Sequence, residues 1–366
     1  MSKVFIPGLA LCEQFYHQVI APLLHTHFPG LTYAAALIGS GSEVMGFDDE
    51  TSTDHHWGPR LMLFLSEEAC QLCSENIHQT LAHRLPLEFQ GYPTHFTPPD
   101  PHDKGVQLLQ PIAQGPVNHR VSIHTLRGFF AEYLGFDIDQ PVEPADWLTF
   151  SEQRLLTITG GAVYHDDIGL NSLRAQFSYY PHDVWLYQMA AAWARIGQEE
   201  HLMGRAGMVG DEVGSAIIGA RLVRDVMRLC FLMERSYAPY PKWFGSGFKQ
   251  LSCAQELWPV LQGALRSDTW QMRESYLVKA YESIAVRHNA LNLTEPLPQR
   301  ATPFHGRSFQ VIALHGFADA LLKRIEDPLV KRIAERPLIG SIDLLSDNTD
   351  FVSTPYWRSL ARQLYQ

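Results

Sequence analysis

The sequence predicts an α+β protein in which a domain of mixed strands and helices precedes an all-α helical bundle. Short strand-like apolar runs lie in the first half of the 366 residues, and long helical patterns with few breakers fill the second half. The length also suits about two domains of roughly 150 residues each. Because the texture changes after Pro181, we expect the boundary near residues 170–182, with domains at 1–175 and 176–366.

The composition narrows the class of protein. A hydrophobic content of 46% with only 19% charged residues predicts a folded core rather than disorder. The net charge of −10 disfavours binding to bulk nucleic acid, and no apolar run approaches the ~18 residues of a membrane span. Five cysteines are too few for a disulfide framework. We therefore expect a cytoplasmic protein without a membrane partner, and the sequence makes no prediction of its oligomeric state.

Periodicity and breakers place the elements of the first half. Apolar residues of Leu9–Phe28 recur at three- and four-residue steps, which is typical of a helix. Ser66 is followed by two acids, a helix-start signal for Ser66–Leu85. Three further runs are predicted strands, a fourth is a weaker strand candidate, and a segment rich in proline, glycine and histidine is a predicted loop. They are the strands Tyr33–Ile38, Arg60–Leu65 and Val117–His124, the candidate Leu155–Val163 and the loop Gly91–Pro116.

The second half reads as consecutive helices. Their patterns are long, and glycine and proline are rare within them. The predicted helices are Asp183–Met203, Glu212–Tyr237, Gln255–Leu265, Trp270–Asn289 and Phe309–Ile325.

One stretch of the first half carries residues suited to phosphate chemistry. A predicted strand enters a glycine–serine turn, and a glycine turn lets phosphate oxygens approach backbone N–H groups. Asp54 and His56 stand two residues apart at the expected start of the next strand, so their side chains should project together. A carboxylate beside a phosphate can hold Mg²⁺. The predicted nucleotide-binding residues of the turn are Gly39, Ser40, Gly41, Ser42 and Gly46.

This stretch resembles the signature of the polymerase-β-type nucleotidyltransferase superfamily, which is Gly-Ser, a later glycine, and Ser-Asp-x-Asp at a strand start. Here the corresponding residues are Gly41-Ser42, Gly46 and Thr53–His56. The chain resembles more closely a bacterial family of unknown function within that superfamily, which also carries three motifs in its helical half. The matching segments here are Tyr180–Trp185, Gly210–Ser215 and Ala238–Trp243.

The resemblance implies a small mixed sheet that bears the active site, followed by a helical substrate domain like that of aminoglycoside nucleotidyltransferases. In the superfamily, Gly-Ser holds the triphosphate and strand carboxylates hold Mg²⁺. The implied reaction transfers a nucleoside monophosphate, with ATP as the default donor of AMP, to a hydroxyl of a small-molecule acceptor. Asp54 and His56 would then be the catalytic and metal-binding residues, with Mg²⁺ or Mn²⁺ as the ion.

The sequence departs from the family pattern in its acids. His56 stands where a second carboxylate is expected, and the predicted strand Val117–His124 has no acid for the third position. Imidazole is a poor ligand for Mg²⁺. Three alternatives follow: an ion that accepts imidazole, such as Mn²⁺; a carboxylate of Asp48, Asp49 or Glu50 that swings in; or a regulatory protein that binds nucleotide without turnover.

The helical half offers cations of two kinds. Arginines at steps of three, four and seven lie along one side of the helix predicted at Glu212–Tyr237. They form either a cationic wall toward a phosphate or a solvent face paired with Asp225 and Glu234. Lys242 is either a phosphate contact or an ordinary surface lysine. The arginines are Arg221, Arg224, Arg228 and Arg235, and we take Arg221, Arg228 and Lys242 as nucleotide-binding candidates.

Two other patterns give weaker hypotheses. Arg195 and His201 have the spacing of an Arg-x(4–6)-His motif found in helical ribonucleases, which fits by chance in a sequence rich in both residues. Four histidines of the first half could form a transition-metal cluster, although neutral histidines without a metal are the simpler interpretation. These histidines are His55, His56, His119 and His124.

Overall fold

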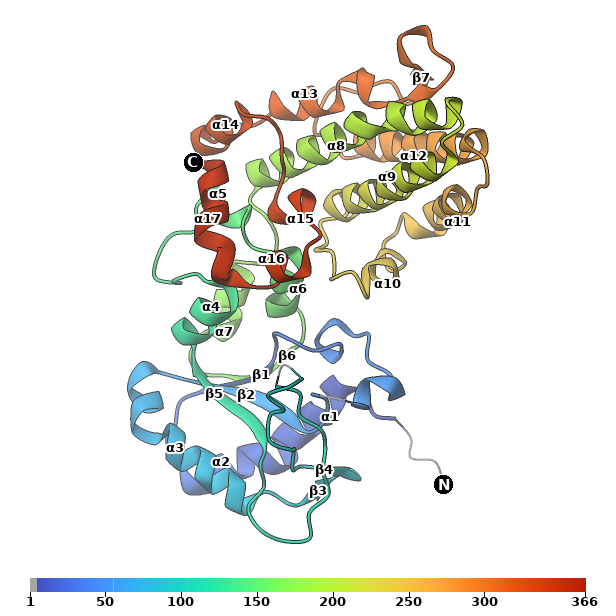
Figure 1. Ribbon diagram of the computed structural model, residues 1–366. Coiled ribbons are helices and arrows are strands. Elements are labelled where there is room, and N and C mark those ends of the chain that lie inside the picture. Colours follow the sequence, from blue (N-terminus) through green and yellow to red (C-terminus); the bar gives the residue numbers. More distant parts are fainter. Residues whose placement is uncertain (1–4, 55, 104) are drawn as a thin grey trace. The chain divides into compact units, whose positions relative to one another are not determined.

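The computed structural model describes residues 5–54, 56–103 and 105–366 (Figure 1). The chain divides into two compact units, one of residues 1–141 with 154–178 and the other of residues 142–153 with 179–366. The short segment 142–153 therefore belongs with the C-terminal unit, although it precedes the predicted boundary. Its side chains explain this, because Asp146 pairs with Arg358 and Arg362, and Glu152 accepts the Ala238 N–H at 2.8 Å.

The first unit contains a mixed four-stranded sheet, which together with the helical second unit confirms the predicted α+β class. The sheet order is β5-β2-β1-β6, with β1 antiparallel to β2 and β6, and β2 parallel to β5. The strands are β1 (Ala34–Leu37), β2 (Arg60–Leu65), β5 (Arg120–Thr125) and β6 (Ala162–Asp166), and a small hairpin pairs β3 (Glu88–Phe89) with β4 (Tyr92–Pro93).

The N-terminal helices and the helix that follows β2 form a core with one face of the sheet. Leu61, Leu63 and Leu65 of β2 alternate along the strand and are buried together with Leu11 and Leu81 of the flanking helices. Because side chains alternate along a strand, Arg60 and Met62 point to the opposite face. The helices are α1 (Gly8–Phe15), a π-helical turn (Tyr16–Ile20), α2 (Ala21–His27), α3 (Glu67–Arg84), α4 (Leu126–Leu134), α6 (Glu152–Thr159) and α7 (Leu170–Ala175).

The predicted strand Leu155–Val163 is wrong. Its first half is the C-terminal part of α6, and β6 begins only after Gly160 and Gly161. Gly161 has φ of +68°, and a Cβ there would meet the Leu37 carbonyl oxygen at 2.1 Å. The two glycines therefore end the helix and let the chain turn against β1, which a single apolar run does not reveal.

The second unit is helical, as predicted. Its longest helices, α8 (His182–Met208) and α9 (Glu212–Met233), pack along each other, and α12 (Trp270–Ala290) packs against both. The other helices are α5 (Pro144–Trp147), α10 (Phe244–Phe248), α11 (Ala254–Leu265), α13 (Phe317–Leu322), α14 (Pro328–Ala334), α15 (Ile342–Leu345), α16 (Thr349–Val352) and α17 (Arg358–Arg362).

The predicted helix Phe309–Ile325 is only partly correct. Its first residues form β8 (Gln310–Val311), which pairs with β7 (Thr302–Pro303). Gly316 then adopts φ of +79° directly before α13. The left-handed glycine breaks the helix that the apolar spacing predicts.

Across the described part of the chain, we find no helix with the length and apolar character needed to cross a membrane.

Candidate functional site

A pocket of about 390 Å³ lies in the first unit, where the β1–β2–β5 part of the sheet meets α4. It includes the sheet face opposite α1–α3, so polar side chains of β2 and β5 can reach it. The lining residues are Ile38, Gly39, Ser40, Arg60, Leu61, Met62, Gln107, His119, Arg120, Val121, Ser122, His124, Phe129, Glu132 and Tyr133.

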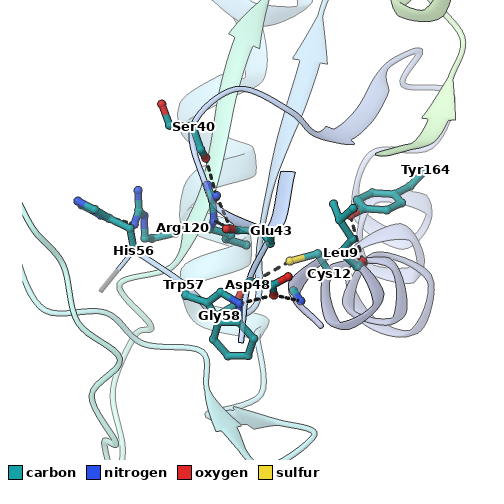
Figure 2. Close-up of polar contacts among 12 residues, drawn as sticks. Leu9, Cys12, Ser40, Glu43, Asp48, His56, Trp57, Gly58, Arg120 and Tyr164 are labelled. Atoms are coloured by element: carbon teal, nitrogen blue, oxygen red, sulfur yellow. Dashed lines mark hydrogen bonds and ion pairs between the residues drawn. The ribbon is translucent and has the colours of Figure 1, made fainter. Parts of the chain in front are cut away.

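Two arginines lie side by side at one end of this pocket. Arg60 opens β2, Arg120 opens β5, and the parallel pairing makes them direct register partners on the same face of the sheet. Like charges in such positions repel each other. The chain balances only one of them: Arg60 donates to the Glu43 carboxylate at 2.5 and 2.9 Å and to the Ser40 carbonyl at 2.7 Å (Figure 2).

Arg120 has no carboxylate within ion-pair distance among the described residues. Its Nη1 lies 2.6 Å from Nδ1 of His56, and because an arginine only donates, this ring nitrogen must be the acceptor (Figure 2). Burial, followed by the charge of Arg60, lowers the pKa of Arg120 to about 10. Arg120 is thus a half-buried cation whose charge an anion would balance.

The glycine–serine turn folds around the Arg60–Glu43 pair. Gly39 and Ser40 line the pocket, and their role in phosphate binding stays a prediction. Gly41 has φ of +144°, and a Cβ there would lie 2.5 Å from both the Arg60 guanidinium and the Glu43 carboxylate. Within the described part of the chain, the Ser40 and Gly41 amides donate to no acceptor, so they are available to a ligand.

Ser42 and Gly46 lie outside the pocket lining, unlike Gly39 and Ser40. The Ser42 carbonyl accepts the amides of Met45 and Phe47, and Gly46, with φ of +72°, ends the 3₁₀ turn Glu43–Met45. Neither residue is among those that line the pocket. They shape the turn rather than face the pocket.

The predicted geometry of Asp54 and His56 is wrong. Asp54 ends a 3₁₀ helix, Glu50–Asp54, with an exposed side chain, and His56 has a left-handed φ of 54°. The strand begins only at Arg60, so the two side chains are not neighbours on a strand face. His55 lies outside the described residues. Neither Asp54 nor His56 lines the pocket, and their roles stay predictions.

Two of the three acids proposed to swing toward a metal, Asp48 and Asp49, are held by other hydrogen bonds. Asp48 accepts the Gly8 amide at 2.6 Å and the Trp57 indole at 3.1 Å, whereas Asp49 accepts the amides of Thr51 and Ser52 in its own turn. Among the described residues that line the pocket, Glu132 is the one carboxylate. The other polar residues of the lining are neutral or cationic. These side chains do not fit Mg²⁺, which prefers several oxygen ligands.

The histidines of β5 and its approach are neutral groups rather than a cluster. His119 is buried against the His78 carbonyl at 3.1 Å, and burial lowers its pKa to about 4. Burial also lowers the pKa of His124, whose Nε2 atom is buried and has no hydrogen-bond partner. No three His, Cys, Asp or Glu side chains within residues 5–54, 56–103 and 105–366 are grouped so that they could hold a metal ion.

The cationic candidates of the helical unit have partners within that unit. Arg221 makes a two-point ion pair with Glu199 at 2.6 and 2.8 Å, Arg224 pairs with Asp347, and Arg228 lies 3.9 Å from Glu152. Of the expected partners, Asp225 does interact electrostatically with Arg224 and Arg228, whereas Glu234 accepts the amides of Ser252 and Cys253.

Lys242 and the ribonuclease-like pair have ordinary surroundings. The exposed Lys242 ammonium lies 4.9 Å from the centroid of the Trp243 ring. His201 stacks on Phe304, while Arg195 pairs with Glu199. None of the pocket-lining residues comes from this unit.

The chain is similar to a family of unknown function over part of its length and to a solved structure. Residues 147–244 match the family model described as a domain of unknown function, DUF4037. No curated protein matches the chain. Among solved structures, the chain is similar to a nucleotidyltransferase-like protein from Exiguobacterium sibiricum 255-15, with a TM-score of 0.33 and 11% identity over 80% of this chain and 82% of that one. The pocket-lining residues all precede the matched family segment.

The sequence patterns did not single out Arg60 and Arg120, which line the pocket. Arg60 is the first residue of a predicted strand, whereas Arg120 lies only within the predicted strand Val117–His124, which lacks an acid. It is the structure that places Arg120 at the start of β5. What the sequence does not show is that β2 and β5 are parallel neighbours in a register that pairs the two.

Proposed function

We propose that the first unit is a nucleotidyltransferase-like unit whose pocket binds the phosphate of a nucleotide through Arg120. In this proposal the protein acts as a nucleotide-binding regulator, the alternative that the missing carboxylates already suggested. The arginine takes the place that a metal ion holds in catalysing relatives, because guanidinium groups suit phosphate oxygens.

The observation that carries the proposal is the Arg60–Arg120 register pair with a single counter-charge. Two half-buried cations on one sheet face are unfavourable unless anions balance them. Glu43 balances Arg60, and Arg120 is left facing the pocket. The amide of Ser40, a residue that lines the pocket, donates to no acceptor within the described part of the chain and adds a neutral donor, as phosphate sites commonly have.

Replacing Arg120 by glutamine tests the proposal. Titration calorimetry with the four 5′-mononucleotides and ATP, in buffer with EDTA, measures binding without a metal ion. We expect the wild type to bind a nucleotide and Arg120→Gln to weaken binding by about tenfold to hundredfold, the usual effect of losing a charged hydrogen bond.

Arg127→Gln serves as the matched control. This exposed arginine of α4 pairs with Asp137 at 2.7 Å and does not line the pocket. The control should bind like the wild type. Equal binding by wild type and Arg120→Gln, or none by the wild type in any buffer, would contradict the proposal.

Transfer of a nucleoside monophosphate to a small hydroxylated acceptor stays a prediction from the sequence. It requires a metal site that Asp54, His56 and Glu132 do not supply in the arrangement described above. Incubation with α-labelled ATP, candidate acceptors and Mg²⁺ or Mn²⁺ tests it. Label that moves to an acceptor in the wild type but not in Asp54→Ala would support transfer over regulation.

A further inference from the structure

We propose that the pocket selects a phosphodiester of a nucleoside, as found in a cyclic mononucleotide or a dinucleoside monophosphate, over a terminal mono- or triphosphate. This rests on the proposed function, namely that the pocket binds a nucleotide phosphate. The inference goes further by specifying the net charge of the phosphate group that is bound. It follows from the charges of the side chains around Arg60 and Arg120.

Among the described residues at this end of the pocket, one positive charge lacks a balancing group. Arg60 is neutralised by Glu43, with hydrogen bonds to the same carboxylate oxygen. Burial lowers the pKa of His119 to about 4 and also lowers the pKa of His124, and both shifts favour the uncharged ring. Glu132 is exposed on α4 and its charge is screened by water. The remaining cation is Arg120.

A phosphodiester matches this count and a terminal phosphate does not. A phosphodiester carries one negative charge, whereas a phosphate monoester carries between about −1.5 and −2 at pH 7. The second charge would enter a half-buried site without a partner, which is unfavourable. A triphosphate adds further charge, which related enzymes balance with metal ions on several carboxylates, whereas Glu132 is the one carboxylate among the described residues that line this pocket.

The rest of the pocket suits the nucleoside. Ile38, Met62, Phe129 and Tyr133 give it an apolar and aromatic wall. The orphaned Nε2 of His124 and the exposed Ser122 offer polar partners to a ring or a sugar hydroxyl. The volume of about 390 Å³ lies within the usual range for small-molecule pockets.

A ligand series of increasing charge tests the selection. Titration calorimetry in EDTA compares, for each of the four common bases, the 3′,5′-cyclic monophosphate, the 5′-monophosphate and the triphosphate, and a parallel triphosphate series contains Mg²⁺. Dinucleoside monophosphates distinguish a linear from a cyclic diester. We expect one diester to bind about tenfold tighter than the 5′-monophosphate of the same base.

A variant that changes only the charge count makes the test sharper. Glu43→Gln keeps an oxygen that can accept from Arg60 but leaves Arg60 unbalanced, so the site gains a second free cation. Its preference should move toward the 5′-monophosphate by about tenfold. Glu88→Gln, an exposed acid of β3 that does not line the pocket, is the control and should keep the wild-type preference.

The outcomes separate this inference from the proposed function. Tighter binding of a 5′-monophosphate or of a magnesium-bound triphosphate by the wild type overturns the selection and leaves nucleotide binding intact. An unchanged preference in folded Glu43→Gln also overturns it. Absence of binding by every nucleotide overturns both. The wild-type series alone decides the selection if Glu43→Gln does not fold.

Discussion

Single residues around the Arg60–Glu43 pair determine the shape of the candidate site. Arg60 is the first residue of β2, and its side chain donates hydrogen bonds to the Ser40 carbonyl and the Glu43 carboxylate, one on each side of Gly41 and Ser42. The turn therefore depends on a side chain that arrives from another strand. The Arg60 side chain fits against the turn because residue 41 is a glycine. A Cβ at this position would collide with the Arg60–Glu43 ion pair.

Gly41→Ala should disrupt both the fold and the pocket. The added methyl lies 2.5 Å from the Arg60 and Glu43 side chains, and the φ of +144° is unfavourable for alanine. We expect a loss of about 1–3 kcal/mol in the free energy of unfolding from the backbone conformation alone, and weaker nucleotide binding because Arg60 is displaced.

Gly46→Ala is the comparison for this prediction. Gly46 also has positive φ, at +72°, but a Cβ there meets nothing within 4 Å. We expect it to cost about 1–2 kcal/mol from the left-handed backbone while leaving ligand affinity unchanged. Urea unfolding and calorimetry of both variants decide the matter, and equal effects on affinity would speak against the steric explanation.

At the scale of elements, the sequence was most informative where the signals were local. Ser66 predicted the start of α3, and its hydroxyl accepts the Ala69 amide at 3.1 Å. The strand predicted at Arg60–Leu65 has the observed bounds. The glycine-rich turn was also predicted, and Gly39 and Ser40 do line the pocket.

Elements that depend on distant partners were predicted poorly. The amide of Glu152, the first residue of α6, donates to Asp343 at 2.9 Å, across 191 positions of the chain. No local pattern reveals such a cap, so the apolar residues of α6 were mistaken for a strand. The role of Asp48 was mispredicted for a similar reason, because its carboxylate accepts the amide of Gly8, 40 positions away.

The C-terminal end of α6 depends on one side chain of α7. Arg174 donates to the carbonyls of Ile158 at 2.7 Å, Thr159 at 2.9 Å and Gly160 at 2.5 Å. Arg174→Met keeps the apolar stem but removes these donors. Since hydrogen bonds to charged groups contribute about 1.5–3 kcal/mol, we expect a loss of that size in the free energy of unfolding.

Arg84→Met provides the matched control for Arg174→Met. Arg84 is exposed in the last turn of α3, where its interaction with the helix dipole contributes less than about 1 kcal/mol. Urea denaturation of the two variants measures the difference. Arg174→Met with the stability of the control would show that water replaces the guanidinium at this helix end.

At the scale of the whole molecule, the two units should respond to pH in opposite directions. In the second unit, burial raises the pKa of Glu152 and Glu200 to about 7 and that of Asp225 to about 6. Such carboxyl groups favour the folded state while they are protonated. Their contribution is complete below the unfolded pKa and is lost as the pH rises through the folded pKa.

The histidines of the first unit act the other way. Burial lowers the pKa of His119 from its ordinary value of 6.5 to about 4 in the folded protein. Acid therefore favours the unfolded chain, in which this histidine binds a proton more readily. Burial lowers the pKa of His124 in the same direction. In the second unit, burial lowers the pKa of His288, so this residue changes stability with pH in the opposite direction to Glu152, Glu200 and Asp225. The effect of one histidine is smaller than that of the three carboxyl groups. Between pH 5 and 7.5 the first unit should therefore gain stability and the second should lose it.

Glu200→Gln isolates the effect in the second unit. Glu200 is buried and accepts the amides of Ile312 and Ala313, and a glutamine there does not ionise. Relative to the variant, the wild type should lose about 2 kcal/mol of unfolding free energy between pH 5 and 7.5. Hydrogen exchange, corrected for intrinsic rates at each pH, follows peptides of the two units separately. Parallel pH profiles in both units, or an equal slope in Glu200→Gln, would refute the assignment of the pH response to these buried groups.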